Sequence, residues 1–465
     1  MPDFFSEPFL HLAGLTHNSA LITWGAFYFR VKDAGKEFKL VDDDDLKRVF
    51  PPRRESIGAR SEPYGPAKVT VSDMADNVVA TASTSTANHC WVSGLAPDTE
   101  YKYRVEVNGE VWARDERRDW VSGGDGAGLD LQGKSYDNRF RTFPDPARPA
   151  KPFHFAVIGD FGVGIRKEKE NRRQRRIAEA LEKAVDEHDV RLVLTTGDNI
   201  YRTGGFLKII GGQTGDEDDD WYFTYYQPYR YVINRVPVYP TIGNHDSPET
   251  EGKDDRSQLV DNFYMDERAA GALDASSLIR GLFYRFRFGS GVEFICLDTS
   301  KEGGPLSERV FKDQRNRGFL QSALPEASGE PRWRIPFCHH PPFCAGPDHP
   351  SDGGGMRDLV KRFEDAGVRV VLSGHEHQFQ HSRSNGVNYI VSGASGKVNT
   401  GTPKKFAKAR TVSWAAACHF LLVKVDGNRM TIRPVGELRD GKLADIELLA
   451  PDGSAVTGPI VVNLA

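Results

Sequence analysis

Two patterns of hydrophobic and polar positions divide the chain near residue 150. From residue 1 to about residue 145, short segments alternate apolar and polar residues, and clusters of turn-forming residues separate them. Alternation with a period of two is typical of strands with one buried face, and many such strands without a helical stretch predict a β-sandwich. The segments are SALITWGAF, AKVTVSD, HCWVSGL, YKYRVEV and NRFRTF.

The pattern changes after the proline-rich stretch PDPARPAKP, residues 144–152. The apolar strand FHFAVIGD is followed by a segment with apolar residues at helical spacing (177–185) and then by a second strand, RLVLTTGD. A strand, a helix and a strand in succession predict a βαβ unit in a buried sheet. We expect further strands at VPVYPTIGN, LFYRFRFG, VEFICLD, RIPFCHH, VRVVLSGH, NYIVSG and FLLVKVDG, and helices over 256–264, 312–324 and 356–366.

These patterns predict two domains. We expect an all-β sandwich over residues 1–146, a proline-rich linker over 147–152, and an α/β domain with mixed sheets over 153–465. The C-terminal tail, LADIELLAPDGSAVTGPIVV, predicts an additional β-hairpin.

Composition and charge exclude several classes of protein. The chain has 465 residues and a net charge of −4, so neither nucleic acid nor an anionic membrane is expected as a partner. Its longest apolar runs are much shorter than the roughly 20 residues that cross a bilayer. The start, MPDFFSEPFLHLAG, lacks the basic and apolar regions of a signal peptide, and we expect a cytoplasmic protein. Five scattered cysteines argue against a disulfide framework or a structural zinc finger.

Three charged or aromatic segments have two interpretations each. VDDDDL (41–46) is either a solvated acidic loop or a calcium site formed by residues 42–45. The basic run at 166–176 is either a solvated helix face, since Glu168 and Glu170 interrupt it, or a contact for nucleic acid. The acidic and aromatic segment 215–229 either lines a substrate entrance or is a solvated loop followed by packed aromatic residues.

The stretch LAPDTEYKYRV identifies the kind of β-sandwich that the first domain resembles. Leu95, Pro97, Thr99 and Tyr101 have the spacing of a tyrosine corner, in which a phenol hydrogen-bonds to the backbone at a sheet edge. On these residues the first domain is similar to a fibronectin type III domain. The resemblance implies that Trp24 is the tryptophan buried in its core.

Five strand ends in the second domain carry metal-ligand side chains. Functional groups of open α/β sheets gather beyond the carboxyl ends of the strands, and the harmless burial of so many polar groups would require a partner for each. A pair of cations supplies those partners together. The side chains are Asp160 in GDFG, Asp198 and Tyr201 in GDNIY, Asn244 and His245 in GNHD, His339 in CHHPP, and His375 and His377 in GHEH.

These motifs, in this order, resemble those of the metallophosphoesterases, and the tyrosine in GDNIY resembles the purple acid phosphatases among them. Asp160-Phe161-Gly162 replaces the Asp-x-His that most metallophosphoesterases carry, as it does in purple acid phosphatases. The resemblance covers residues 153–425, and it implies a four-layer α/β/β/α sandwich behind the all-β domain.

The resemblance also implies how the ligands divide between two metals. One metal is expected to bind Asp160, Asp198, Tyr201 and His377, and the other Asp198, Asn244, His339 and His375. Carboxylate and phenolate oxygens suit Fe(III), whereas imidazole and amide ligands suit a divalent ion such as Fe, Zn or Mn. An iron–tyrosinate bond would give the protein a visible colour.

The catalytic roles are implied by the same resemblance. A metal-bound hydroxide attacks the phosphoryl group, His245 points at the phosphate, and Asp246 orients His245. In the loop CAGPDHPSDGGG, Asp348 and His349 resemble the pair that binds phosphate and protonates the leaving group. The alternatives are a supporting role for His245 and an exposed loop position for His349, while His340 is expected to line the pocket rather than to bind metal.

The preferred function is an acid phosphatase that hydrolyses small phosphate monoesters. The alternative within the same fold is a phosphodiesterase or nucleotidase, although an acidic insertion and a negative net charge disfavour long polyanions. A binding protein with structural metals is the alternative from another class, but a structural site needs neither His245 nor a histidine-bearing loop.

Overall fold

The computed structural model describes most of both predicted domains. The described residues are 4–32, 37–41, 46, 48, 58–113, 120–121, 128–129, 136–165, 168–201, 221–246, 257–271, 273–277, 282–300, 314–326, 329 and 331–464. The acidic stretch 42–45, the start of the basic run (166–167) and the acidic part of the insertion (215–220) lie outside them. Within the described residues, no helix is long and apolar enough to cross a membrane.

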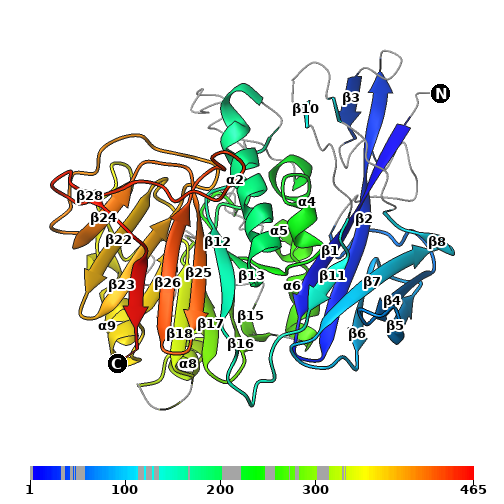
Figure 1. Cartoon of the computed structure of the whole chain (residues 1–465), viewed down its shortest axis with the longest axis horizontal. Coiled ribbons are helices and arrows are strands. Elements are labelled where there is room, and N and C mark those ends of the chain that lie inside the picture. The colour runs from blue at the N-terminus through cyan, green and yellow to red at the C-terminus, as the bar shows by residue number, and fades with distance from the viewer. Residues whose placement is uncertain are drawn as a thin grey trace.

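The N-terminal domain consists of two facing antiparallel sheets (Figure 1). Their inward residues, such as Trp24, Val69 and Val105, are almost completely buried, as expected when alternate side chains of each strand face a shared core. One sheet contains β1 (Phe4–Leu15), β2 (Ser19–Lys32), β3 (Glu37–Leu40) and β6 (His89–Ser93). The other contains β11 (Arg139–Arg141), β7 (Glu100–Val107), β4 (Ala67–Ser72), β5 (Val78–Thr84) and β8 (Glu110–Val111).

The tyrosine corner has the predicted hydrogen bond. Tyr101 is 4% exposed, and its hydroxyl accepts the backbone N–H of Ala96 at 2.8 Å. Trp24 lies in the core of the same domain. The all-β character of the domain is therefore confirmed, whereas its membership of the fibronectin type III class stays a prediction.

The C-terminal domain is built around two mixed sheets. The first runs β14 (Val238–Tyr239), β13 (Val190–Thr195), β12 (Phe153–Ile158), β25 (Phe420–Asp426), β26 (Arg429–Val435), β29 (Ile460–Asn463). The second runs β15 (Asp274–Ser277), β16 (Phe283–Phe288), β17 (Val292–Leu297), β18 (Trp333–Cys338), β21 (Val370–Ser373), β23 (Val387–Ser392), β22 (Phe379–Ser384), β24 (Thr411–Ala415), β27 (Leu448–Leu449), β28 (Ala455–Val456). The C-terminal tail thus contributes a hairpin, β27–β28, to the second sheet and a strand, β29, to the first.

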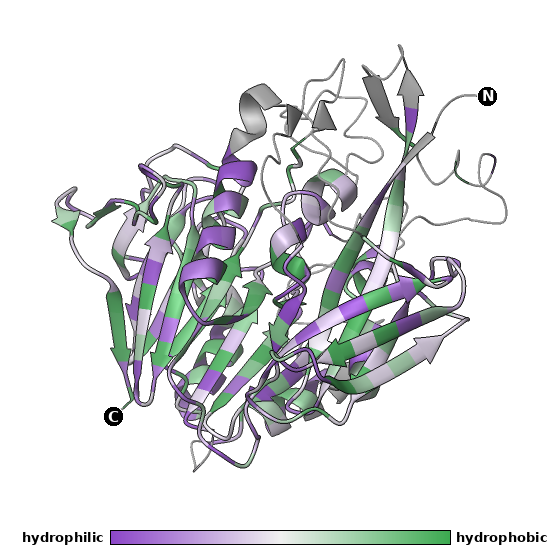
Figure 2. Cartoon of the chain, turned by 45° about the vertical axis from the view of Figure 1, so that its right-hand side comes forward, coloured by the Kyte–Doolittle hydropathy of each residue, from purple (hydrophilic) through white to green (hydrophobic). Residues whose placement is uncertain are grey.

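Helices cover the outer faces of the two sheets and complete the four layers. Helix α2 (Glu168–Glu187) packs over the first sheet, where it contacts β25, and α8 (Gln314–Ala323) packs against β15 and β16 of the second. Helix α9 (Arg357–Asp365) buries Leu359 and Phe363 in the core of the second sheet. Figure 2 shows α2 with hydrophilic residues facing outward and hydrophobic residues on the strands beneath it. The predicted α/β/β/α architecture is confirmed.

Shorter helices connect the sandwich to the N-terminal domain. They are η2 (Tyr222–Tyr226), α4 (Arg230–Ile233), α5 (Ser257–Asn262) and α6 (Met265–Gly271). The predicted helix at 256–264 corresponds to α5, and the aromatic residues at the end of the insertion form η2, which is buried.

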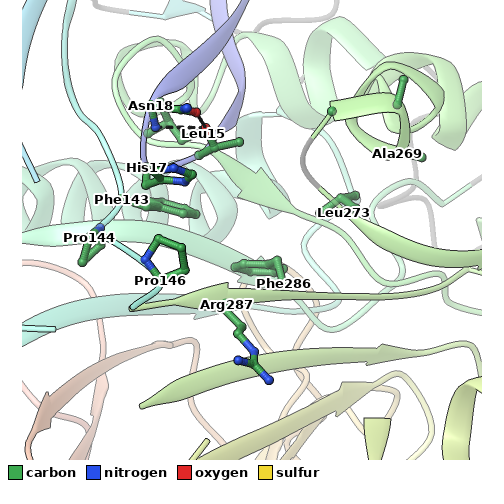
Figure 3. Close-up of a pocket in the computed structure, with 13 residues that line it drawn as sticks. Leu15, His17, Asn18, Phe143, Pro144, Pro146, Ala269, Leu273, Phe286 and Arg287 are labelled. Atoms are coloured by element: carbon green, nitrogen blue, oxygen red, sulfur yellow. Dashed lines mark hydrogen bonds between the residues drawn. The ribbon is translucent and has the colours of Figure 1, made fainter. Parts of the chain in front are cut away.

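Polar and apolar contacts join the two domains. Arg230 forms a buried ion pair with Glu7, and the Tyr103 hydroxyl donates to the carbonyl of Asn234 at 2.7 Å. A groove of about 500 Å³ lies at the junction, where His17 comes from the N-terminal domain and Phe286 from the second sheet (Figure 3). None of the residues lining this groove belongs to the predicted metal site.

Candidate metal centre

Parallel strands bring the predicted ligands to one edge of the sandwich. Strands β12, β13 and β14 run parallel in the first sheet, and β18 and β21 run parallel in the second. Each of the five is followed within a few residues by one of the predicted motifs. The ligands therefore lie together because the carboxyl ends of parallel strands meet at the same edge of a sheet.

The ligand turns have unusual backbone geometry. Asp160, Asp198 and His375 have φ angles of 52°, 50° and 71°, in the left-handed region that residues with a Cβ rarely adopt. Such conformations are typical of functional sites, where the surrounding structure imposes them.

Glycines before the ligands permit the close approach of neighbouring turns. A Cβ on Gly243 would lie 2.1 Å from Asp198 Oδ1, and one on Gly374 would lie 2.5 Å from Asp160 Oδ2. Both distances are far inside van der Waals contact. The glycines of the GN and GH pairs are therefore required by packing against the carboxylates.

One group of ligand atoms joins the first sheet to the turn after β21. Oxygen and nitrogen atoms of Asp160, Asp198 and His377 lie within 4.8 Å of one another. The Tyr201 hydroxyl is 3.2 Å from His377 Nε2 and 3.4 Å from Asp160 Oδ1. These four residues are the set expected for the first metal.

A second group is rich in histidine. Ring nitrogens of His339, His340 and His375 lie within 4.8 Å of one another. His339 Nε2 is also 2.8 Å from Asn244 Oδ1 and 3.5 Å from Asp198 Oδ1. The set expected for the second metal is thus gathered around His339, with Asp198 reaching both groups.

The hydrogen bonding of His339 supports a cation at this position. Burial lowers the pKa of His339, so its ring is neutral and carries one proton. The Thr196 carbonyl lies 2.8 Å from Nδ1 and can only accept, so Nδ1 carries the proton and donates it. The other ring nitrogen, Nε2, therefore has a free lone pair. This lone pair faces the amide oxygen of Asn244 at 2.8 Å and the Nδ1 atom of His375 at 3.1 Å. Three atoms of the types that bind metals meet at this point, which fits a bound cation.

The acidic groups support the same conclusion. Burial, followed by the negative charge of Asp198, raises the pKa of the Asp160 carboxyl well above its ordinary value. Burial and the neighbouring carboxylates also raise the pKa of the Tyr201 phenol. A strong Lewis acid offsets both effects because it stabilises carboxylate and phenolate together. The residues present therefore fit a dinuclear metal centre.

His245 lies beside the first group, while Asp246 has a different position from the one predicted. The ring centroids of His245 and Tyr201 are 4.6 Å apart, and the His245 backbone N–H donates to Asp198 Oδ1 at 3.0 Å. The Asp246 carboxylate accepts N–H groups of Asn199, Ile200 and Gly243 instead of orienting the His245 ring. Asp246 thus ties the turn after β13 to the turn after β14.

Asp348 and His349 separate in the structure. The His349 ring stacks on the His375 ring, with centroids 4.0 Å apart and planes at 30°. The Asp348 carboxylate accepts a hydrogen bond from the Asn399 side chain. The structure therefore places the His349 ring on a ligand ring, while the Asp348 side chain is bonded to Asn399.

Two residues near the centre had no assigned role in the sequence interpretation. Glu376 is visible in the GHEH motif, but nothing in the sequence shows which backbone groups it meets. The Lys397 ammonium lies 4.4 Å from the centroid of the Tyr201 ring, on a loop that carries no recognisable motif. Cys338 and Cys344, on either side of His339 and His340, are both free thiols.

Comparison with known proteins agrees with this geometry. Residues 153–379 match the family described as Calcineurin-like phosphoesterase, and that segment contains every predicted ligand. The second domain is therefore a calcineurin-like phosphoesterase domain, and its ligand groups fit a dinuclear metal centre. Purple acid phosphatase 4 of Arabidopsis thaliana is 25% identical over 274 residues, which cover 55% of this chain and 72% of that protein. Among the metallophosphoesterases, the chain is thus similar in sequence to a purple acid phosphatase.

Solved structures show the same fold over nearly the entire chain. PhoD has a TM-score of 0.62 at 15% identity, and the match covers 98% of this chain and 94% of that one. Purple acid phosphatase PPD1 from yellow lupin seeds has a TM-score of 0.60 at 13% identity, with coverages of 98% and 74%. At these identities the likeness concerns the fold, and it includes the N-terminal β domain as well as the sandwich.

Proposed function

We propose that this metallophosphoesterase is an acid phosphatase that hydrolyses small phosphate monoesters. Asp160, Asp198, Tyr201 and His377 would hold Fe(III), and Asp198, Asn244, His339 and His375 would hold divalent Fe, Zn or Mn. When bound, the metal pair supplies Lewis-acid stabilisation of the phosphoryl oxygens and activates the attacking water. The remaining tasks fall to side chains around the pair.

The position of His349 is the observation that carries the proposal for monoesters. Its ring stacks on His375 while the residue itself is exposed, so it reaches both the ligand groups and the solvent. An imidazole there can donate a proton to the departing alkoxide or phenoxide oxygen, a step that matters most when the leaving group is basic. His245, held through its backbone N–H by Asp198, would donate a hydrogen bond to a phosphoryl oxygen.

The composition of the chain agrees with small substrates. Its net charge is −4, which gives no general attraction for polyanions. A phosphodiesterase or nucleotidase is the alternative that the first experiment must separate. We expect kcat/KM for p-nitrophenyl phosphate to exceed that for bis-p-nitrophenyl phosphate at acid pH, and the opposite order would contradict the proposal.

A leaving-group series tests the role of His349. In His349→Ala, turnover of an alkyl phosphate should fall by about 100-fold, the lower end of the range for general acid catalysis. Turnover of p-nitrophenyl phosphate should fall much less because its leaving group needs little protonation. His17→Ala, which removes a histidine of the domain junction, is the matched control. Equal losses on both substrates would show that His349 is not the proton donor.

A further inference from the structure

We propose that Glu376 is a positioning residue that holds residues 345–349, the His349 loop, against the metal-ligand turn through hydrogen bonds to its carboxylate. The proposal rests on the function proposed above for His349. Glu376 stands between the ligands His375 and His377, and it is 1% exposed. Its side chain therefore starts from the same short turn that carries two of the ligands.

The carboxylate binds two consecutive backbone groups of the loop. Glu376 Oε2 accepts the N–H of His349 at 2.8 Å and the N–H of Asp348 at 3.3 Å. Because one of the donors is the backbone of His349 itself, these bonds fix the position from which its ring reaches His375.

The other backbone N–H groups of the loop have acceptors elsewhere. The N–H of Ala345 donates to Gln380 Oε1 at 2.7 Å, and the N–H of Gly346 points to Cys344 Sγ at 3.2 Å. Pro347 has no N–H to satisfy. Glu376 is thus the acceptor for the remaining two donors, and without it they would lose their protein partner.

Packing at Gly346 shows how closely the loop fits Glu376. A Cβ on Gly346 would lie 2.2 Å from Glu376 Cδ and 2.2 Å from its Oε2. No side chain can be placed there unless the loop or the glutamate moves. The close fit provides a way to displace the loop without changing Glu376 itself.

Asn399 braces the opposite side of the loop. Its backbone N–H donates to the carbonyl of His377 at 2.9 Å, and its side chain donates to the Asp348 carboxylate. Hydrogen bonds from both Glu376 and Asn399 therefore connect the loop to the GHEH turn. The His349 ring stacks on His375, although His349 is an exposed residue. An exposed side chain keeps one position only if the backbone that carries it is held in place.

The two oxygens of Glu376 suggest a pair of matched variants. Oε1 has no hydrogen-bond partner among the described residues, whereas Oε2 accepts both loop N–H groups. Glu376→Gln keeps an oxygen acceptor for the loop and places its amide nitrogen on the unpartnered side. Glu376→Met has a similar length and no comparable acceptor. The comparison isolates hydrogen-bond acceptance from side-chain size.

The test combines kinetics with hydrogen exchange on the metal-loaded enzyme. The kinetic measure is the ratio of kcat/KM for p-nitrophenyl phosphate to kcat/KM for glycerol 2-phosphate. We expect Glu376→Met and Gly346→Ala to raise this ratio at least tenfold, part of the effect of removing a general acid, and Glu376→Gln to keep it within about twofold of wild type. Deuterium uptake by a peptide spanning the loop should accelerate in the first two variants only.

Each outcome separates this proposal from the proposed function. If Glu376→Met leaves both deuterium uptake and the ratio unchanged, Glu376 does not position the loop. If the Gln and Met variants change equally, acceptance by Oε2 is not the cause. Should Glu376→Met lose metal by elemental analysis, Gly346→Ala decides, because it alters no residue of the GHEH turn. If His349→Ala does not change the ratio, the proton-donor role fails, while faster loop exchange in Glu376→Met would still support the clamp.

Discussion

His419 should make the stability of this protein depend on pH in a measurable way. The residue is completely buried, its Nδ1 lies 2.9 Å from the carbonyl of Ala417, and its Nε2 lies 3.1 Å from the Ser392 hydroxyl. A neutral ring satisfies both contacts, with Nδ1–H as donor and Nε2 as acceptor. The His419 carbonyl accepts the Ser395 hydroxyl, which in turn accepts the N–H of Gly159, next to Asp160.

The size of the effect follows from the pKa of the ring. Burial lowers the pKa of His419 to about 4, compared with about 6.5 in an unfolded chain. A depressed pKa means that the unfolded state binds the proton first, so stability is complete above pH 6.5 and is lost as the pH falls towards 4. From the linkage relation, the loss is about 2 kcal/mol at pH 5 and about 3 kcal/mol at pH 4.

The experiment compares urea unfolding of wild type and His419→Asn between pH 7.5 and pH 4. The asparagine amide can still donate to the carbonyl of Ala417, but it does not titrate. Other histidines contribute equally to both proteins and cancel in the difference. We expect wild type to lose about 2 kcal/mol relative to the variant by pH 5 and about 3 kcal/mol by pH 4. Parallel stability curves over this range would refute the reasoning.

Three further predictions concern the metal centre. Tyr201→Phe should abolish the visible band of the iron-loaded protein, because phenylalanine has no phenolate oxygen, and an unchanged spectrum would contradict the assignment. Asp246→Asn should destabilise the protein by about 2–4 kcal/mol, since two buried N–H groups then face an amide nitrogen; urea unfolding measures this, and a loss near zero would argue against the brace. Gly243→Ala should reduce metal content by elemental analysis, because its methyl group would lie 2.1 Å from Asp198 Oδ1. Gly355→Ala, with no atom within 4 Å of its Cβ, is the control, and equal metal content in the two variants would contradict the prediction.

The ligands could be predicted from the sequence because each depends on local signals. Asp160, Asn244 and His375 each follow an apolar segment and a glycine. Parallel strands end at one edge of a sheet, so local order along the chain becomes proximity in space. The helix over 312–324 was also predicted from local sequence, and it is observed at Gln314–Ala323.

The supporting residues could not be predicted because their roles arise between segments far apart in the sequence. Asp246 follows His245, and adjacency suggested that it orients that ring, but burial directs its carboxylate to the turn at Asn199. Glu376 meets backbone groups 27 and 28 residues earlier. A hydrogen bond from a side chain to a distant backbone leaves no periodic pattern, so only coordinates reveal it.

The position of β12 in its sheet has a consequence for biosynthesis. This strand, which leads to Asp160, pairs on one side with β13 and on the other with β25, formed by Phe420–Asp426. During translation the first metal ligand therefore emerges long before its sheet can close, since domains fold as units. Metal uptake must then follow the release of almost the whole polypeptide from the ribosome.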